Sequence, residues 1–113
     1  MLKKPTKLKR GDTVATVSPS WGGAGEQELR WRYDLGVKRL EEVFGLNVVA
    51  MPNSLKGAQY VYEHPEARAQ DLMDAFKDPT IKAIITNIGG EDSVRLLPYI
   101  DFDVIRDNPK IFM

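Results

Sequence analysis

The feature that most constrains the fold is an alternation of short, continuous apolar runs with longer segments of helical periodicity. The apolar runs cover residues 13–18, 46–51, 81–86 and 110–113. Runs without polar alternation are typical of strands that are buried on both faces of a sheet. Strands that alternate with helices indicate a parallel sheet with helices on both of its faces. We therefore expect a flavodoxin-like or Rossmann-like three-layer α/β domain with about four strands.

Two segments show a clear helical period. In residues 26–44 the apolar side chains recur every three or four positions, and Gly45 follows as a stop signal. The second helix should begin near His64 and Pro65, because proline suits the first turn, and should end at 77–79. On this second helix, Arg68 and Asp71 are three residues apart, which predicts an exposed ion pair of small energetic value.

The remaining segments are shorter. A short helix should run to residue 97, capped by Asp92 or Ser93 and ended by Pro98, and Asp101 should cap another helix over residues 102–107. Residues 53–62 show no period and are expected to form a loop.

Length and composition narrow the function classes. The 113 residues suit one domain, and 16 basic residues balance 16 acidic ones, so nothing favours nucleic acid or a membrane surface as a partner. With no cysteine, disulfides and a cysteine nucleophile are excluded. No apolar run approaches the roughly 20 residues of a membrane span, and no apolar segment of a secretory signal follows the basic start. We expect a cytoplasmic protein without a cofactor.

Ligands of open parallel sheets bind outside the carboxyl ends of the strands, where this chain has two candidate loops. The first covers residues 18–25. The second covers residues 87–92 and contains Gly89 and Gly90. Glycines permit a positive φ and a close approach to the backbone, and amides in such a turn can hold negative charge. The alternative is a glycine pair that only makes a tight turn. Neither a dinucleotide fingerprint nor a P-loop is present.

The polar residues of these loops do not make a complete catalytic set. Ser18 and Ser20 could contact a ligand or satisfy loop backbone groups, and neither lies in a nucleophile elbow. Glu91 and Asp92 could contact a ligand or favour the start of the next helix. His64, the only histidine, is expected in a capping or surface role, and no histidine–carboxylate cluster predicts a metal site.

Trp21, beside Gly22 and Gly23 in the first loop, and Arg95, in the short helix, each allow more than one interpretation. Trp21 could stack on a ligand or cover the first loop. Arg95 could form another surface ion pair or reach the carboxylate of a substrate.

Several motifs resemble the LD-carboxypeptidase family of serine peptidases. Residues 8–13 (LKRGDT) and 17–20 (VSPS) resemble the opening of that family, and residues 66–72 (EARAQDL) resemble its next helix. Residues 88–101 (IGGEDSVRLLPYID) resemble its glycine turn and the segment that follows. The acidic residue and Asp-Ser after the glycines resemble the microcin C immunity branch more than the murein-recycling branch.

The resemblance implies that residues 1–113 are an N-terminal α/β domain and that the C-terminal catalytic domain is absent. It implies a Ser-Glu-His triad between the two domains, with the serine just past Met113 and the other two residues in the missing domain. No triad residue is then expected within this chain, and the chain alone should be inactive. The resemblance further implies that the backbone of Gly89 or Gly90 helps to form the oxyanion hole. The substrate would be a small peptide or an aminoacyl nucleotide.

A second hypothesis is a non-catalytic α/β module that binds a ligand or a partner. Residues 109–113 (PKIFM) begin an apolar strand, and an unpaired strand edge invites pairing with another chain. This hypothesis predicts a homodimer formed through that edge.

Overall fold

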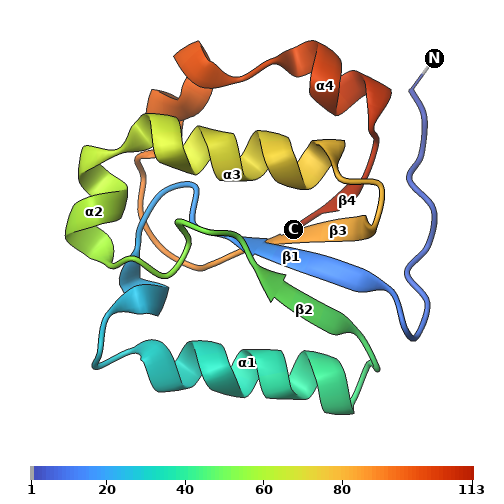
Figure 1. Ribbon diagram of the computed structural model, residues 1–113, viewed down its shortest axis with the longest axis horizontal. Helices are drawn as coiled ribbons and strands as arrows, with labels where there is room; N and C mark the ends of the chain where they lie inside the picture. The colour runs from blue at the N-terminus through green and yellow to red at the C-terminus, as the bar shows by residue number, and fades with distance from the viewer. Residues whose placement is uncertain (1) are drawn as a thin grey trace.

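A computed structural model describes residues 2–113 and contains a four-stranded, all-parallel sheet in the order β2-β1-β3-β4. The strands are β1 (Thr13–Val17), β2 (Asn47–Ala50), β3 (Ile81–Thr86) and β4 (Ile111–Phe112). Helix α1 (Arg30–Glu42) lies on one side of the sheet and α3 (Pro65–Lys77) on the other (Figure 1). The predicted α/β class, the parallel sheet and the helices on both faces are confirmed.

Helix α3 anchors the larger part of the core. It begins at Pro65 and ends at Lys77, as predicted. Its buried stripe packs against the sheet beside Ala15, Val17 and Ile84. That stripe consists of Ala69, Leu72, Met73, Ala75 and Phe76. Because this helix has so many buried side chains, it provides a rigid base for any polar group that it carries.

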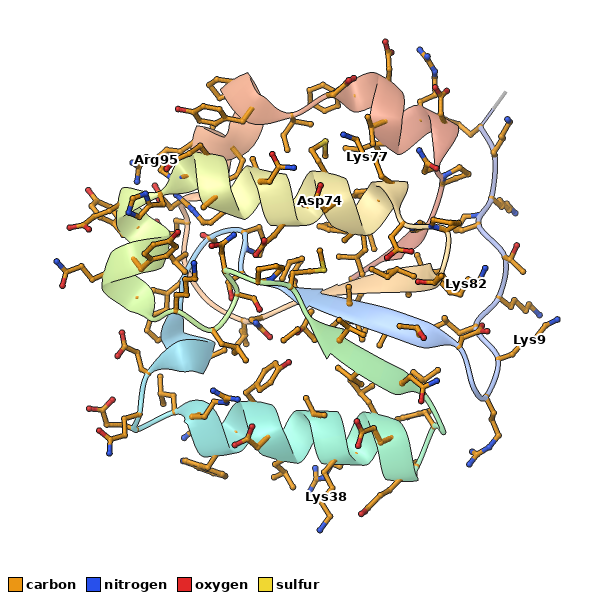
Figure 2. All side chains as sticks on the ribbon, in the orientation of Figure 1. Lys9, Lys38, Asp74, Lys77, Lys82 and Arg95 are labelled. Carbon is orange, nitrogen blue, oxygen red and sulfur yellow. The ribbon has the colours of Figure 1, made fainter. Side chains whose placement is uncertain are left out.

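Helix α1 is covered less completely. No residue of α1 is fully buried, and Trp31 is 58% exposed with the Arg32 guanidinium over its ring. Lys38 points away from the sheet (Figure 2). Gly45 ends this region with φ +65°, and its N–H donates to the Glu41 carbonyl, so the predicted stop is confirmed.

The start of α1 differs from the prediction. The helix begins at Arg30 rather than Glu26, after a short 3₁₀ segment η1 (Gly23–Gly25). Glu26 does not lie in the first turn of α1. Its Oε1 instead accepts a hydrogen bond from the Ala58 N–H at 2.7 Å.

The predicted loop over residues 53–62 was wrong in part, because it contains helix α2 (Ala58–Glu63). Six residues are too few to show a helical period. The start of α2 is stabilised by the distant Glu26 carboxylate rather than by a side chain at its own N-cap. A sequence pattern cannot reveal a cap that lies 32 residues away.

Two further helical segments follow β3. Segment η2 (Ser93–Tyr99) is a 3₁₀ helix that includes Pro98, so the prediction that Pro98 ends it was wrong. Proline in the last turn removes only one N–H donor, which a short 3₁₀ segment tolerates. Helix α4 (Phe102–Asp107) follows, and its predicted cap is confirmed, because the Asp101 side chain accepts from the Asp103 N–H.

Candidate functional site

The strand order reverses at the carboxyl ends of β1 and β3. From β1 the chain crosses to β2 on one side, and it later returns to β3 on the other side. Such a reversal is where open α/β sheets place their ligands. The two strands end level, since Val17 pairs with Thr86 and the Asn87 N–H donates to the Val17 carbonyl at 2.8 Å. The two loops that the sequence singled out therefore leave the sheet side by side.

The glycine turn packs directly against the first loop. Gly89 and Gly90 have φ of +113° and +88°, which side chains rarely adopt. A Cβ on Gly89 would lie 2.4 Å from the Trp21 ring, and one on Gly90 would lie 2.5 Å from the Ser20 Oγ. Among the described residues, none accepts a hydrogen bond from either glycine amide. The turn thus has a left-handed backbone conformation at both glycines, and the two N–H groups remain available to donate hydrogen bonds to a ligand.

Ser18 lies beneath this turn and is buried. Its hydroxyl donates to the Ser54 carbonyl at 2.7 Å and accepts from the Asn87 amide at 3.0 Å. One hydroxyl therefore connects the ends of β1 and β3 with the loop after β2. With its proton donated to a carbonyl, Ser18 holds the loops together in this geometry.

Ser20 and Asp92 form a second direct bond between the two loops. The Ser20 Oγ accepts from the Asp92 N–H at 2.7 Å. Glu91, in the same turn, is exposed. The structure thus brings Ser20, Gly89, Gly90 and Asp92 together, and it leaves Glu91 facing solvent.

Arg68 is the site residue whose place the sequence reasoning missed. It is 2% exposed and does not pair with Asp71, so the predicted exposed ion pair was wrong. Its Nη1 donates to the carbonyls of Pro19 and Ser20, at 2.9 and 3.2 Å. Its Nη2 donates to the Asp92 carboxylate at 2.9 Å.

A signal for this burial was present in the sequence. Arg68 precedes Leu72 by four residues, so the apolar period itself places Arg68 on the buried stripe of α3.

The Asp92 carboxylate has two cationic partners. Arg95 donates to it at 3.0 Å and also donates to the Tyr62 carbonyl at 2.8 Å. Partial burial alone would raise the pKa of Asp92, but the hydrogen bonds and charges of Arg95 and Arg68 outweigh burial and lower that pKa. Asp92 is therefore held as a carboxylate. Arg95 donates its hydrogen bonds to Asp92 and to the Tyr62 carbonyl, both within this chain.

Of the other candidate residues, His64 lies apart from this cluster, whereas Trp21 borders it. The His64 Nδ1 pairs with Glu66 at 2.8 Å, and its ring lies 4.3 Å from that of Tyr60. Trp21 is 40% exposed and covers both Gly23 and Gly89. In the part of the chain that the structure describes, no group of three or more histidine, cysteine or acidic residues could hold a metal ion.

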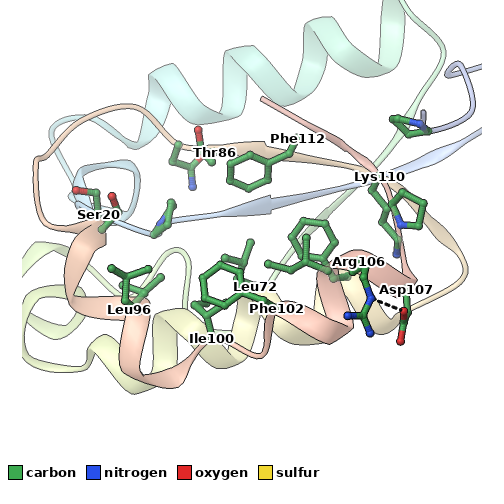
Figure 3. Close-up of a pocket in the computed structure, with 18 of the residues that line it drawn as sticks. Ser20, Leu72, Thr86, Leu96, Ile100, Phe102, Arg106, Asp107, Lys110 and Phe112 are labelled. Atoms are coloured by element: carbon green, nitrogen blue, oxygen red, sulfur yellow. Dashed lines mark hydrogen bonds and ion pairs between the residues drawn. The ribbon is translucent and has the colours of Figure 1, made fainter. Parts of the chain in front are cut away.

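An apolar groove begins at the glycine turn. It has a volume of about 1000 Å³ and runs between the open edge of the sheet at β4 and the segments η2 and α4 (Figure 3). Ser20 lies at one end, and Arg106, Asp107 and Lys110 lie at the other (Figure 3). The walls between these ends are formed by apolar side chains that include Leu72, Phe76, Leu96, Ile100 and Phe112. The available amides thus border a large apolar surface.

No helix within residues 2–113 combines the length and apolar character that a membrane span requires.

The sequence matches a known protein family and several of its members. Residues 14–113 match the LD-carboxypeptidase N-terminal domain. The probable murein peptide carboxypeptidase of Bacillus subtilis is 34% identical over 96% of this chain and 32% of its own length. The microcin C7 self-immunity protein MccF of Escherichia coli is 32% identical over 94% of this chain and 30% of its own length.

Solved structures give the same result. A MccF-like protein from Streptococcus pneumoniae, crystallised in complex with AMP, superposes with a TM-score of 0.82 at 44% identity. That match covers 90% of this chain and 30% of the other. The chain thus spans about a third of the length of the relatives that it matches. These matches, together with the fold and the glycine turn, show that the chain belongs to the LD-carboxypeptidase family, whose N-terminal domain residues 14–113 match.

Proposed function

We propose that this chain is the N-terminal part of a serine-type carboxypeptidase and supplies one wall of its active site. The observation that carries the proposal is the turn at Gly89 and Gly90. Its amides have no acceptor among residues 2–113, and it lies at the carboxyl edge of the sheet. The Ser-Glu-His triad would lie outside residues 1–113, with the serine just past Met113.

The proposed chemistry requires donors where negative charge develops. The serine oxygen would attack the carbonyl carbon of an amide while the histidine takes the serine proton, and the electron pair of the C=O bond would move onto the carbonyl oxygen. Collapse of this tetrahedral species would release the amine, which takes a proton from the histidine, and water would then hydrolyse the acyl-enzyme. Amides of the glycine turn would stabilise the oxyanion, and one such donor is worth about 2.7–4 kcal/mol in the transition state.

The substrate would be a small acylated amino acid, either a peptide or an aminoacyl nucleotide. The AMP complex of the Streptococcus pneumoniae protein supports the nucleotide class. The 34% identity to the probable murein peptide carboxypeptidase of Bacillus subtilis supports the peptide class. The apolar groove beside the glycine turn would be covered by the rest of the enzyme, and the whole protein would act in the cytoplasm.

Two measurements test this proposal. The purified chain should hydrolyse neither an LD-linked peptide nor a peptidyl-adenylate analogue, because residues 1–113 would lack the nucleophile. The gene beyond the codon for Met113 should encode a glycine–aromatic–serine–aspartate segment and a second domain with the glutamate and the histidine. Turnover by the chain alone, or a different downstream sequence, would contradict the proposal.

The exposed edge of the sheet favours a second candidate, a non-catalytic module that self-associates. Strand β4 is the last strand of the sheet, and Phe112 and Met113 are 51% and 70% exposed beside the apolar groove. Such an edge can pair with a second copy. Light scattering should then show a dimer whose population rises with concentration, and a strict monomer would exclude it.

A further inference from the structure

We propose that Arg68 is a positioning residue that fixes the glycine turn against the loop after β1. This inference rests on the proposed function, since it concerns how the amides of Gly89 and Gly90 are aimed. The guanidinium reaches both loops at once. One nitrogen bonds to carbonyls of the first loop, and the other bonds to Asp92 of the second.

The contacts form a closed circuit. Arg68 donates to the Ser20 carbonyl, the Ser20 Oγ accepts from the Asp92 N–H, and the Asp92 carboxylate accepts from Arg68. Asp92 follows Gly90 by two residues, so this circuit closes around the end of the turn. The turn cannot move away from the first loop without breaking at least one of these bonds.

The circuit is attached to a rigid element. Arg68 projects from α3, whose neighbouring positions Ala69 and Leu72 are buried in the main core. A planar guanidinium also has a fixed fork of donors, which a lysine ammonium lacks. The direction in which the turn presents its amides is therefore set by the helix rather than by the loop sequence alone.

Stability alone is a weak explanation for this arginine. Its side chain is 1% exposed, and its Nε has no hydrogen-bond partner among the described residues. Burying a charge is unfavourable, and buried ion pairs are often no more stabilising than apolar residues of similar volume. The arrangement is better explained by the geometry that it imposes on the two loops.

The first experiment measures the turn in the 113-residue chain by NMR. We compare Arg68→Lys and Ser20→Ala with Asp71→Asn, a control on the same helix whose partner, Asn53, lies after β2. Backbone order parameters of Gly89 and Gly90 should fall from about 0.85 toward 0.6 in the first two variants. The Asp92 amide should also exchange faster with solvent in both. The control should leave both readouts unchanged.

Because Ser20→Ala breaks the circuit without touching the buried charge, it keeps the test valid if Arg68→Lys fails to fold. Unchanged order parameters in a folded variant, or an equal change in Asp71→Asn, would overturn the positioning role.

The second experiment measures catalysis in the full-length protein that contains this chain. Arg68→Lys should lower kcat by about 10- to 100-fold with KM nearly unchanged, because a misaligned donor weakens the transition state more than the ground state. Asp71→Asn should leave kcat unchanged. Equal kcat values for Arg68→Lys and the unmodified protein would overturn the inference. An inactive unmodified protein would refute the proposed function, while the NMR result would still decide whether Arg68 fixes the turn.

Discussion

Arg68 and Asp71 lie three residues apart on the same helix, are each 2% exposed, and nevertheless point to different regions. Arg68 bonds to the two loops at the carboxyl edge of β1 and β3. Asp71 bonds to the backbone N–H of Asn53 at 2.9 Å and to its side-chain amide at 2.8 Å, in the loop after β2. Helix α3 therefore supports the candidate site through Arg68 and supports the loop after β2 through Asp71.

The carboxyl groups in the two regions, Asp71 and Asp92, differ in the charge of their hydrogen-bond partners. Asp71 has only a neutral partner, and burial raises its pKa in spite of the hydrogen bonds from Asn53. Asp92, the carboxylate bound by Arg68, is flanked by two guanidinium groups, and its pKa is lowered. The carboxylate with two cationic partners lies at the site, whereas the carboxyl group with an amide partner lies away from it. Equal burial thus says little about which group serves function.

The largest expected effect comes from Arg68→Met. This variant leaves the carbonyls of Pro19 and Ser20 without their charged donor and leaves Asp92 with Arg95 as its remaining cationic partner. Because hydrogen bonds to charged groups contribute roughly 1.5–3 kcal/mol each, the free energy of unfolding should fall by about 3–5 kcal/mol. Asp71→Asn keeps one acceptor for Asn53 and should lower it by only about 1–2 kcal/mol. Urea titration of both variants measures the difference. A larger loss in Asp71→Asn would reverse the ranking of the two networks.

A smaller effect should come from Gly90→Ala, compared with Gly11→Ala. Both glycines have φ near +90°, but a Cβ at Gly11 meets nothing within 4 Å, whereas one at Gly90 lies 2.5 Å from the Ser20 Oγ. Gly11→Ala should therefore lose about 1–2 kcal/mol from backbone strain alone. Gly90→Ala should lose roughly 1–3 kcal/mol more, because of overpacking between the loops.

Chemical denaturation of the two alanine variants gives this difference directly. Equal losses would mean that the two loops are not in fixed contact at the turn, and the Arg68 network would then not be holding them together.

The smallest effect should be the pH dependence of the two carboxylates. The lowered pKa of Asp92 stabilises the fold at pH values above 3.8, which is the ordinary pKa of this side chain. This stabilisation is lost as the pH falls through the lower pKa of the folded state. The raised pKa of Asp71 acts in the opposite direction, so its contribution improves as the pH falls toward 3.8.

Unfolding free energies measured between pH 7 and pH 3 (roughly the window in which carboxylates titrate) separate the two slopes. Relative to Asp92→Asn, the unmodified chain should lose stability on acidification, and relative to Asp71→Asn it should gain stability. Slopes of the same sign would show that the two carboxylates do not differ in their surroundings as described.

Much of the fold could be predicted from local patterns. The run at residues 81–86 is β3, Pro65 begins α3, and Gly45 ends the α1 region. Helix α2 could not be predicted, because its N-terminal amide is satisfied by the distant Glu26.

The sequence also located the two loops of the candidate site. It placed Gly89 and Gly90 after an apolar strand, and the structure gives both a positive φ. Whether these glycines bind an oxyanion, and whether Ser18 or Ser20 contacts a ligand, remains a prediction. The sequence did not reveal that the group approaching the glycine backbone would be the neighbouring Ser20–Trp21 loop.

The sequence by itself determined the order of the four strands and of the helices α1, α3 and α4, the stop at Gly45 and the family to which the chain belongs. These follow from patterns within a helix or strand and from motifs that occur in a fixed order. Only the tertiary structure decided that Arg68 does not pair with its neighbour Asp71. Arg68 instead binds Asp92, 24 residues away, and two backbone carbonyls. These carbonyls belong to Pro19 and Ser20, which are 49 and 48 residues away. The physical reason is that a parallel sheet brings the ends of distant strands together, and a buried guanidinium must take its partners from whichever groups meet there.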